Sequence, residues 1–499
     1  MNSETNNENT TINKKQNLFQ KLKALSRKKK IILACVGIAL VIALIVAGIF
    51  VERSARVEEP SLDEIVEEKL GAYETDLLDS LESLTTSDKV ADYLVTWATN
   101  KNIKATKDAN NNVIFSLKSS SKEYKGLDPV VIMCEYDANN MANYVEPIAT
   151  ALTVAKNAQE HPAFKVIFMP RNNGQMQGAE TLASKYVADD AKIFVLGSSS
   201  SSKVATTTGG YKLITITDKL KKTKSENDKA YKISIDNLPE YEATYAMNPI
   251  KTLGNLLANF KSTSLLFELS SFKGGDDPDT IPTSASVTVV INSADEEKFK
   301  SKMDRAIEKY LSKYGTDYPD ITYTYEEAVA PSKVFTKKET ENIVSLMYTA
   351  MNGVYYKDDD GNIVAVTNIG KISTKNSKLS ISISAMSSSA ELLDEISEAY
   401  KTIAGLCDVK SKTTKSYDVY AGGGKTTALL DEFETSFVEF TGDSEMIVEE
   451  AYESTPCSVF AEENEGLSML YFGVTEKTKE KFAGSIITFL NTQGTATEE

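Results

Sequence analysis

The spacing of apolar and polar residues after position 60 predicts helices that alternate with strands. The capping-box spacing of Ser61 and Glu64 predicts a helix toward Leu84, and apolar residues at helical spacing predict a second helix from Ser87. Short apolar stretches then predict strands over 103–105, 112–117, 129–134, 165–169 and 192–196, with a helix over 148–159. Strands alternating with helices are typical of α/β layers around a largely buried sheet.

A second pattern occupies the middle of the chain, where apolar and polar residues alternate as in strands with one exposed face. It predicts strands over 211–217, 231–235, 285–291 and 378–383, and helices over 249–260, 296–314 and 391–406. From about residue 411 the first pattern returns, with helices over 427–437 and 477–490 and strands over 446–450 and 469–473. We therefore expect an α/β body of residues 52–208 and 411–495, split by an α+β insert of residues 209–410.

The first sixty residues differ from the rest in charge and hydropathy. Residues 1–30 carry eight basic and two acidic side chains, although the whole chain has a net charge of -16. Residues 31–51 contain no charge and no proline, and a helix needs about 20 such residues to cross a bilayer. By the positive-inside rule, this predicts a cytoplasmic tail (1–30), a transmembrane helix (31–51) and an extracytoplasmic body, in a single-pass protein of the plasma membrane.

Composition excludes several kinds of chemistry. The chain has one histidine, His161, which rules out zinc sites and catalytic centres that need two imidazoles. Its four cysteines form no C-x-x-C pair, so neither a zinc ribbon nor a disulfide framework is indicated. The acidic net charge disfavours nucleic acid as a partner, because phosphate binding needs a basic face.

Several short motifs follow one another between residues 80 and 492. They are DANNNVI at 108–114, VVIMCEYD at 130–137, FMPRNNGQMQGA at 168–179, Gly209–Gly210, KGGDDPDTIP at 273–282, Asn352–Gly353 and Asn368–Ile369–Gly370. Their order resembles the aminoacyl-histidine (Xaa-His, or cytosolic non-specific) dipeptidases of the di-zinc metallopeptidases. The resemblance implies an α/β peptidase body, an inserted lid or dimerisation region, and zinc as the cofactor of the family.

The same resemblance implies that the catalytic positions have changed. Glu135 stands where the family has the histidine of its H-x-D motif, whereas Asp137 keeps the aspartate. Asn172 and Asn173 replace the two glutamates that serve as general base and metal ligand. An amide cannot take a proton from a metal-bound water. We therefore expect no catalytic residue at these positions.

Further ligand positions of the family are also altered. Gly197 stands at a metal-binding aspartate and Tyr452 at the histidine of an H-A-G-L-E-C stretch, and no histidine occurs over 473–481. The substrate-binding G-G-H-S-G reads EYEAT at 240–244, and Met386 replaces an arginine. No bound metal is expected, because Asp137 and Glu135 supply at most two of the three or four ligands that zinc requires.

Two functions remain as expectations. The first is an inactive relative of the dipeptidases that binds a peptide or another ligand at the former-site positions, or forms a homodimer through the insert. The second is an active metal-dependent dipeptidase or hydrolase with a rearranged, carboxylate-only metal site at Glu135 and Asp137. Acidic clusters at 276–279 and 358–360 could supply oxygen ligands, but such runs are more typical of solvated loops and turns.

Overall fold

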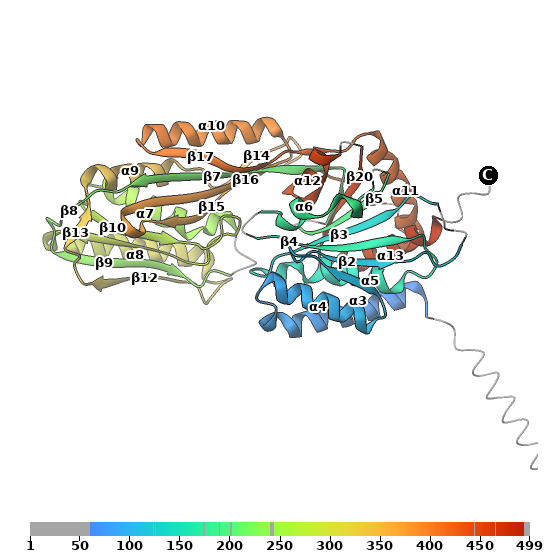
Figure 1. The fold of residues 1–499 in the computed structure, drawn as a ribbon. Coiled ribbons are helices and arrows are strands. Elements are labelled where there is room, and N and C mark those ends of the chain that lie inside the picture. Colours follow the sequence, from blue (N-terminus) through green and yellow to red (C-terminus); the bar gives the residue numbers. More distant parts are fainter. Residues whose placement is uncertain are drawn as a thin grey trace, which may run out of the picture. The chain divides into compact units, whose positions relative to one another are not determined.

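Two β-sheets organise the part of the chain that the computed structural model describes. That part is residues 60–493 without 123, 125, 173–174, 189, 200–201, 240–243, 444 and 465. The chain divides into residues 1–61 and residues 62–499, and both sheets belong to the second unit (Figure 1).

The first sheet has seven strands in the order β1-β2-β4-β3-β5-β20-β6. They are β1 (Lys104–Lys107), β2 (Val113–Leu117), β3 (Val130–Tyr136), β4 (Phe164–Pro170), β5 (Lys192–Ser198), β6 (Lys203–Ala205) and β20 (Ser468–Val474). β3 is parallel to β4 and β5, and β5 is parallel to β20. Every residue of β3 is buried, as expected for a central parallel strand covered on both faces.

Helices cover both faces of this sheet. One face packs against five helices in a single apolar core: α3 (Leu62–Ser80), α4 (Ser87–Asn100), α5 (Val145–Asn157), α11 (Gly424–Thr441) and α13 (Lys479–Thr492). The other face packs against α6 (Gln177–Thr181) and α12 (Pro456–Glu463). The resulting layers are visible in Figure 1.

The second sheet has eleven strands and is mostly antiparallel. Its main path is β12-β9-β11-β10-β15-β16-β7-β17, with β14 beside β15 and with β18 and β19 beside β7. The strands are β7 (Thr207–Lys219), β9 (Lys229–Asp236), β10 (Glu268–Gly274), β11 (Ala285–Ile291), β12 (Thr322–Ala328), β14 (Gly353–Lys357), β15 (Ile363–Ser373), β16 (Lys378–Ser387), β17 (Lys410–Tyr417), β18 (Tyr420–Ala421) and β19 (Ala451–Ser454).

Four helices pack with this sheet in a second apolar core: α7 (Pro249–Ser262), α8 (Glu296–Tyr314), α9 (Lys337–Thr349) and α10 (Ala390–Leu406). A separate pair is formed by β8 (Lys222–Lys224) and β13 (Lys333–Phe335). The long strand β7 contributes side chains to two apolar cores. Tyr211 packs with the first sheet, whereas Ile214 and Ile216 pack in the core of the second sheet. This strand therefore ties the two sheets together.

Most of the predicted elements are confirmed. β11 and α8 have the bounds expected from the sequence, and α7, α10 and α13 differ from expectation by a few residues. The strand expected over 446–450 is wrong: Val448 makes only an isolated bridge with Val204. β17 was not predicted, because its sequence KSKTTKSY is almost entirely polar and its partner β7 supplies the pairing.

The expectation of a plasma-membrane protein is corrected. In the described part of the chain, no helix is both long enough and apolar enough to cross a bilayer. The predicted tail (1–30) and the predicted transmembrane helix (31–51) lie outside the described residues.

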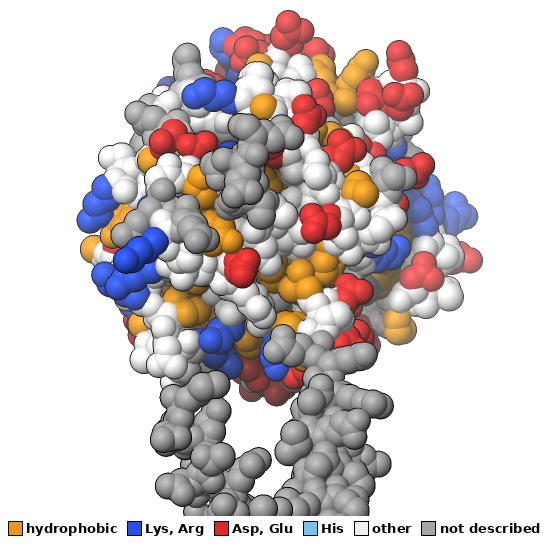
Figure 2. Space-filling model, turned by 90° about the vertical axis from the view of Figure 1, so that its right-hand side faces the viewer, with side chains coloured by type: hydrophobic (Ala, Val, Ile, Leu, Met, Phe, Trp, Pro, Cys, Tyr) orange, Lys and Arg blue, Asp and Glu red, His pale blue; other side chains and the backbone are white. Residues whose placement is uncertain are grey.

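Charged side chains of both signs are interspersed on the face of the molecule shown in Figure 2. Acidic groups are spread widely over that face, and the basic groups form only small clusters. This face therefore presents no extended basic surface.

Candidate functional site

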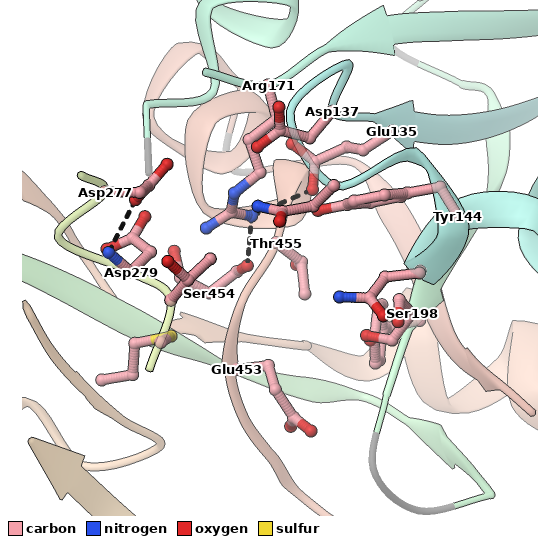
Figure 3. Close-up of a pocket in the computed structure, with 16 residues that line it drawn as sticks. Glu135, Asp137, Tyr144, Arg171, Ser198, Asp277, Asp279, Glu453, Ser454 and Thr455 are labelled. Carbon is pink, nitrogen blue, oxygen red and sulfur yellow. Dashed lines mark hydrogen bonds and ion pairs between the residues drawn. The ribbon is translucent and has the colours of Figure 1, made fainter. Parts of the chain in front are cut away.

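A pocket of about 200 Å³ lies at the edge of the first sheet where three of its parallel strands end (Figure 3). Glu135 and Asp137 come from the end of β3, Arg171 follows β4, and Gly197 and Ser198 end β5. Carboxyl ends of parallel strands meet at one edge of a sheet, which is where such folds bind ligands. The second sheet contributes the loop between β10 and β11, Met386 of β16, and residues in and after β19.

An arginine occupies the centre of this pocket. The backbone N–H of Arg171 donates to the carbonyl of Tyr136 at 2.7 Å, which extends the β3–β4 pairing by one residue. Its Nη1 lies 3.1 Å from Glu135 Oε2 and donates to the carbonyl oxygen of Ser454, also at 3.1 Å. The side chains of Arg171 and Glu135 are only 12% and 7% exposed, so this is a buried ion pair.

Three further carboxylates surround the guanidinium. Asp137 accepts a hydrogen bond from the Asn139 N–H at 2.9 Å, and Asp277 accepts one from the Asp279 N–H at 2.8 Å. Asp279 Oδ1 accepts from the Tyr211 hydroxyl at 2.8 Å. Figure 3 shows Asp277 and Asp279 to the left of the guanidinium and Asp137 above it.

Burial changes the acidity of all these groups. Desolvation raises the pKa of Glu135, of Asp137 and of Asp277, although Arg171 acts in the opposite direction on each. Burial, together with the neighbouring aspartates, raises the pKa of Asp279 to about 6. Burial disfavours the charge of Arg171, but the carboxylates, Glu135 first, raise its pKa above the usual value. The guanidinium is therefore a permanent cation among carboxylates that hold their protons more tightly than usual.

Two carboxylate oxygens in this pocket have no hydrogen-bond partner among the described residues. They are Glu135 Oε1 and Asp279 Oδ2, and both are inaccessible to solvent. A buried acceptor without a donor costs free energy. These two oxygens therefore add to the cost of burying the carboxylates in this pocket.

The ring of Tyr471 occupies the space beside Gly197. A Cβ atom on Gly197 would lie 2.5 Å from Cε2 and 2.8 Å from the hydroxyl oxygen of Tyr471. Tyr471 is 2% exposed, and its hydroxyl donates to the carbonyl of Ser198 at 3.2 Å. A side chain at position 197 therefore cannot fit unless Tyr471 moves.

Tyr452 and Asn172 do not line the pocket. Tyr452 is half-buried, and the ammonium of Lys203 lies 5.4 Å from the centre of its ring. Its neighbour Glu453 does line the pocket and pairs with Lys203 at 3.1 Å. The Asn172 side chain is exposed and accepts from Asn139 Nδ2 at 3.4 Å, while Asn173 lies outside the described residues.

The donor set of this pocket does not fit zinc. Its titratable lining consists of carboxylates, tyrosines and one arginine, and the arginine already engages Glu135. In the described part of the chain, the one group of three potential ligands within 4.8 Å of one another is Glu74, Glu146 and Glu476, elsewhere in the fold. Lys479 already contacts two members of that group, at 2.5 Å from Glu74 and 2.6 Å from Glu476.

The single histidine is not near the pocket. His161 is 8% exposed, with Nδ1 2.8 Å from the carbonyl oxygen of Pro162 and its ring 4.9 Å from that of Phe164. It packs in the connection before β4. Cys134 and Cys457 are buried free thiols, and burial raises the pKa of Cys457 to about 12. A thiol with so high a pKa is a poor nucleophile.

Sequence reasoning missed several pocket residues. Asp277 and Asp279 were interpreted as part of a solvated loop, but Asp277 is 9% exposed and both line the pocket. Arg171 directly precedes Asn172 in the motif, so its place after a buried strand could have drawn attention to it. Tyr471 gave no comparable signal, because its contact with Gly197 joins two strands far apart in the sequence.

Comparisons with solved structures define the fold. The chain is similar to the aminoacylhistidine dipeptidase from Vibrio alginolyticus, with a TM-score of 0.55 and 18% identity over 83% of this chain and 96% of that one. The di-peptidase Dug1p from Saccharomyces cerevisiae gives a TM-score of 0.44 and 10% identity, with coverage of 87% and 99%. The YXEP protein of Bacillus subtilis, a dinuclear metal binding peptidase of the M20 family, gives 0.35 and 10%, with coverage of 85% and 99%.

No protein-family model and no curated protein matches the sequence. The likeness to the Vibrio alginolyticus enzyme confirms the predicted α/β peptidase-like fold. At 18% identity it defines the fold and leaves the chemistry to the residues of this chain.

Replacing Arg171 should destabilise the protein through Glu135. Arg171→Met leaves a buried carboxylate without its counter-charge, so we expect the free energy of unfolding at pH 8 to fall by about 3–5 kcal/mol. Adding Glu135→Gln should recover part of the loss. Denaturant titration of both variants measures this, with the exposed Arg305→Met as control. If the loss in the double variant equals the sum of the losses in Arg171→Met and in Glu135→Gln alone, the two side chains are not coupled.

Gly197→Asp should be destabilising because Tyr471 fills the space that a side chain would need. We expect a loss of about 1–3 kcal/mol in the free energy of unfolding, the usual cost of overpacking. Gly424→Asp is the matched control, since a Cβ atom there meets nothing within 4 Å. Unchanged thermal stability of Gly197→Asp would contradict the packing described here.

Asp279→Asn should change how stability depends on pH. Because the folded protein raises this pKa to about 6, the carboxyl group contributes stability at low pH that is lost as the pH rises through about 6. The variant should therefore match the parent near pH 3.5 and be more stable at pH 8, by about 1–3 kcal/mol. Denaturant titration at both pH values tests this, with the exposed Asp276→Asn as control. A variant that is less stable at pH 8 would show that the charged carboxylate is net stabilising.

Proposed function

We propose that this chain is a binding protein on the fold of the dipeptidases, that it does not hydrolyse peptides, and that its pocket holds a small peptide ligand by a positively charged amino group. The observation that carries the proposal is the buried ion pair of Arg171 with Glu135. The fold shared with the aminoacylhistidine dipeptidase supports the location of the site.

The ion pair disfavours a metal centre on electrostatic grounds. Glu135 stands at a family ligand position, and one of its oxygens is engaged by a guanidinium at 3.1 Å. Arginine remains protonated at any accessible pH, so a divalent cation brought beside it would meet a fixed positive charge. The remaining carboxylates would have to overcome that repulsion without histidine or thiolate ligands.

Peptide hydrolysis also requires a base that can take a proton from the attacking water. The resemblance assigns that place to position 172, where this chain has an exposed asparagine. The carboxylates in the pocket are engaged in other ways: Glu135 with Arg171, and Asp279 with Tyr211. We infer that the pocket binds its ligand without activating a water.

The charge balance of the pocket favours a cationic group on the ligand. Its described lining contains five carboxylates, Glu135, Asp137, Asp277, Asp279 and Glu453, against the single cation Arg171. Lys203 offsets Glu453, which leaves the three aspartates in excess. An ammonium group has three donors, which can bind acceptor oxygens of the carboxylates that line the pocket.

The alternative is a hydrolase with a carboxylate-only metal site at Glu135 and Asp137. Such a site needs several ligand oxygens directed at one point. In the described residues, the pocket carboxylates do not form such a group. The geometry therefore favours the binding protein.

The proposal is tested with free dipeptides and their N-acetylated counterparts. Free dipeptides should raise the melting temperature of the purified full chain in a saturable way, and acetylation should remove the shift because it removes the ammonium charge. No product should form over hours with zinc, manganese, cobalt or chelator present, as measured by chromatography.

Asp277→Asn should weaken the affinity for free dipeptides about tenfold or more. Asp276→Asn, one residue earlier and exposed, should leave that affinity unchanged. Metal-dependent turnover that disappears in Asp137→Ala would contradict the absence of hydrolysis and support the hydrolase. A thermal shift that is the same for free and acetylated dipeptides would contradict the role of the amino group.

A further inference from the structure

A second hollow, of about 750 Å³, lies between α7, α8 and β12 and shares no residue with the pocket described above. We call it the α7–α8 groove. It is lined by Ala246, Thr252, Asn255, Leu256, Asn259, Thr263, Lys302, Arg305, Ala306, Lys309, Tyr310, Lys313, Tyr314 and Tyr323.

Tyrosine side chains fix the walls of the α7–α8 groove through hydrogen bonds and a ring contact. The hydroxyl of Tyr310 donates to the carbonyl of Met247 at 2.8 Å, and that of Tyr314 donates to the carbonyl of Ala246 at 3.1 Å. The ring of Tyr310 meets that of Tyr323 edge-on, with centroids 5.6 Å apart. Tyr323 is 4% exposed, and its hydroxyl has no partner among the described residues. The groove is therefore a preformed hollow with a buried polar group in its wall.

One wall carries a row of four cations. Lys302, Arg305, Lys309 and Lys313 are spaced three or four residues apart, so they share one face of α8. None of the four has an ion-pair partner among the described residues, whereas Lys300 on the same helix pairs with Glu296 at 2.8 Å. Like charges at this spacing repel one another.

No carboxylate lies among the described lining residues of the α7–α8 groove. Of the acidic residues on α8 in this stretch, Asp304 accepts from the Tyr325 hydroxyl at 3.0 Å, and Glu308 is exposed; neither lines the groove. The described lining of the groove is thus locally positive in a chain with a net charge of -16. The row therefore indicates an anionic partner.

We propose that the α7–α8 groove binds an acidic peptide segment in an extended conformation. The cations from Lys302 to Lys313 span about 16 Å along the helix. Alternate side chains of an extended peptide are about 6.8 Å apart, so three acidic side chains match the length of the row. Asn255 and Asn259, one helical turn apart on α7, offer amides that can both donate to and accept from a peptide backbone.

A peptide fits this groove better than a nucleic acid does. Four cations within about 16 Å neutralise only a few phosphates, and the acidic remainder of the chain repels a long polyanion. The amide groups of α7 give a peptide backbone hydrogen bonds that a phosphate chain, which has no donors, cannot fully use.

The test is fluorescence anisotropy of fluorescein-labelled hexaglutamate with the full chain at low salt. The quadruple variant Lys302→Glu, Arg305→Glu, Lys309→Glu and Lys313→Glu should bind at least about thirtyfold more weakly. The control variant replaces four exposed lysines outside the groove with glutamate: Lys333, Lys357, Lys410 and Lys412. Its affinity for hexaglutamate should lie within about twofold of the parent's.

Both quadruple variants change the net charge equally, so an equal loss in both would overturn the proposal in favour of bulk electrostatics. Absence of saturable binding to the parent would also overturn it. Labelled oligothymidine of equal charge should bind at least about tenfold more weakly than hexaglutamate, and equal or tighter binding would assign the groove to nucleic acid. If the quadruple variant does not fold, the single variants Arg305→Glu and Lys309→Glu test the proposal instead. Each should weaken hexaglutamate binding severalfold.

Discussion

The ion pair between Arg171 and Glu135 constrains the pocket more than any other contact. It joins the ends of β3 and β4, and through the carbonyl of Ser454 it also reaches the segment at the end of β19. A buried pair of this kind is only weak evidence for stability, because desolvation offsets most of the attraction. Its significance lies in geometry: a planar cation with five donors holds the surrounding acceptors at defined positions.

The charge of Arg171 also affects the pKa values of the neighbouring aspartates. Burial raises the pKa of Asp137, Asp277 and Asp279, and the charge of Asp277 raises the pKa of the other two further. Arg171 opposes that effect on each of them, so part of their negative charge can persist near neutral pH. Strongly perturbed acids in a cleft are more common at functional sites than elsewhere. The pocket thus combines one buried cation with carboxyl groups of raised pKa.

The sequence predicted the layers of the fold well, because buried strands such as β3 and amphipathic helices such as α8 leave periodic patterns. It predicted the ends of β3 and β5 as site positions through the resemblance, and the structure brings Glu135, Asp137 and Gly197 to one pocket. It did not reveal Tyr471, since contacts across strands leave no local pattern. Asp279 was overlooked because an acidic run looks the same whether the folded chain buries it or leaves it in water.

The packing of Tyr471 against Gly197 couples the effects of substitutions at the two positions. The resemblance places a metal-binding aspartate at position 197, but Tyr471 now fills that space. An aspartate at position 197 alone would clash with the ring of Tyr471. Removing that ring alone would open a void in the sheet. Each of these two changes is harmful unless the other has already occurred, a relation called reciprocal epistasis. An aspartate at position 197 therefore requires two coordinated changes, one in β5 and one in β20.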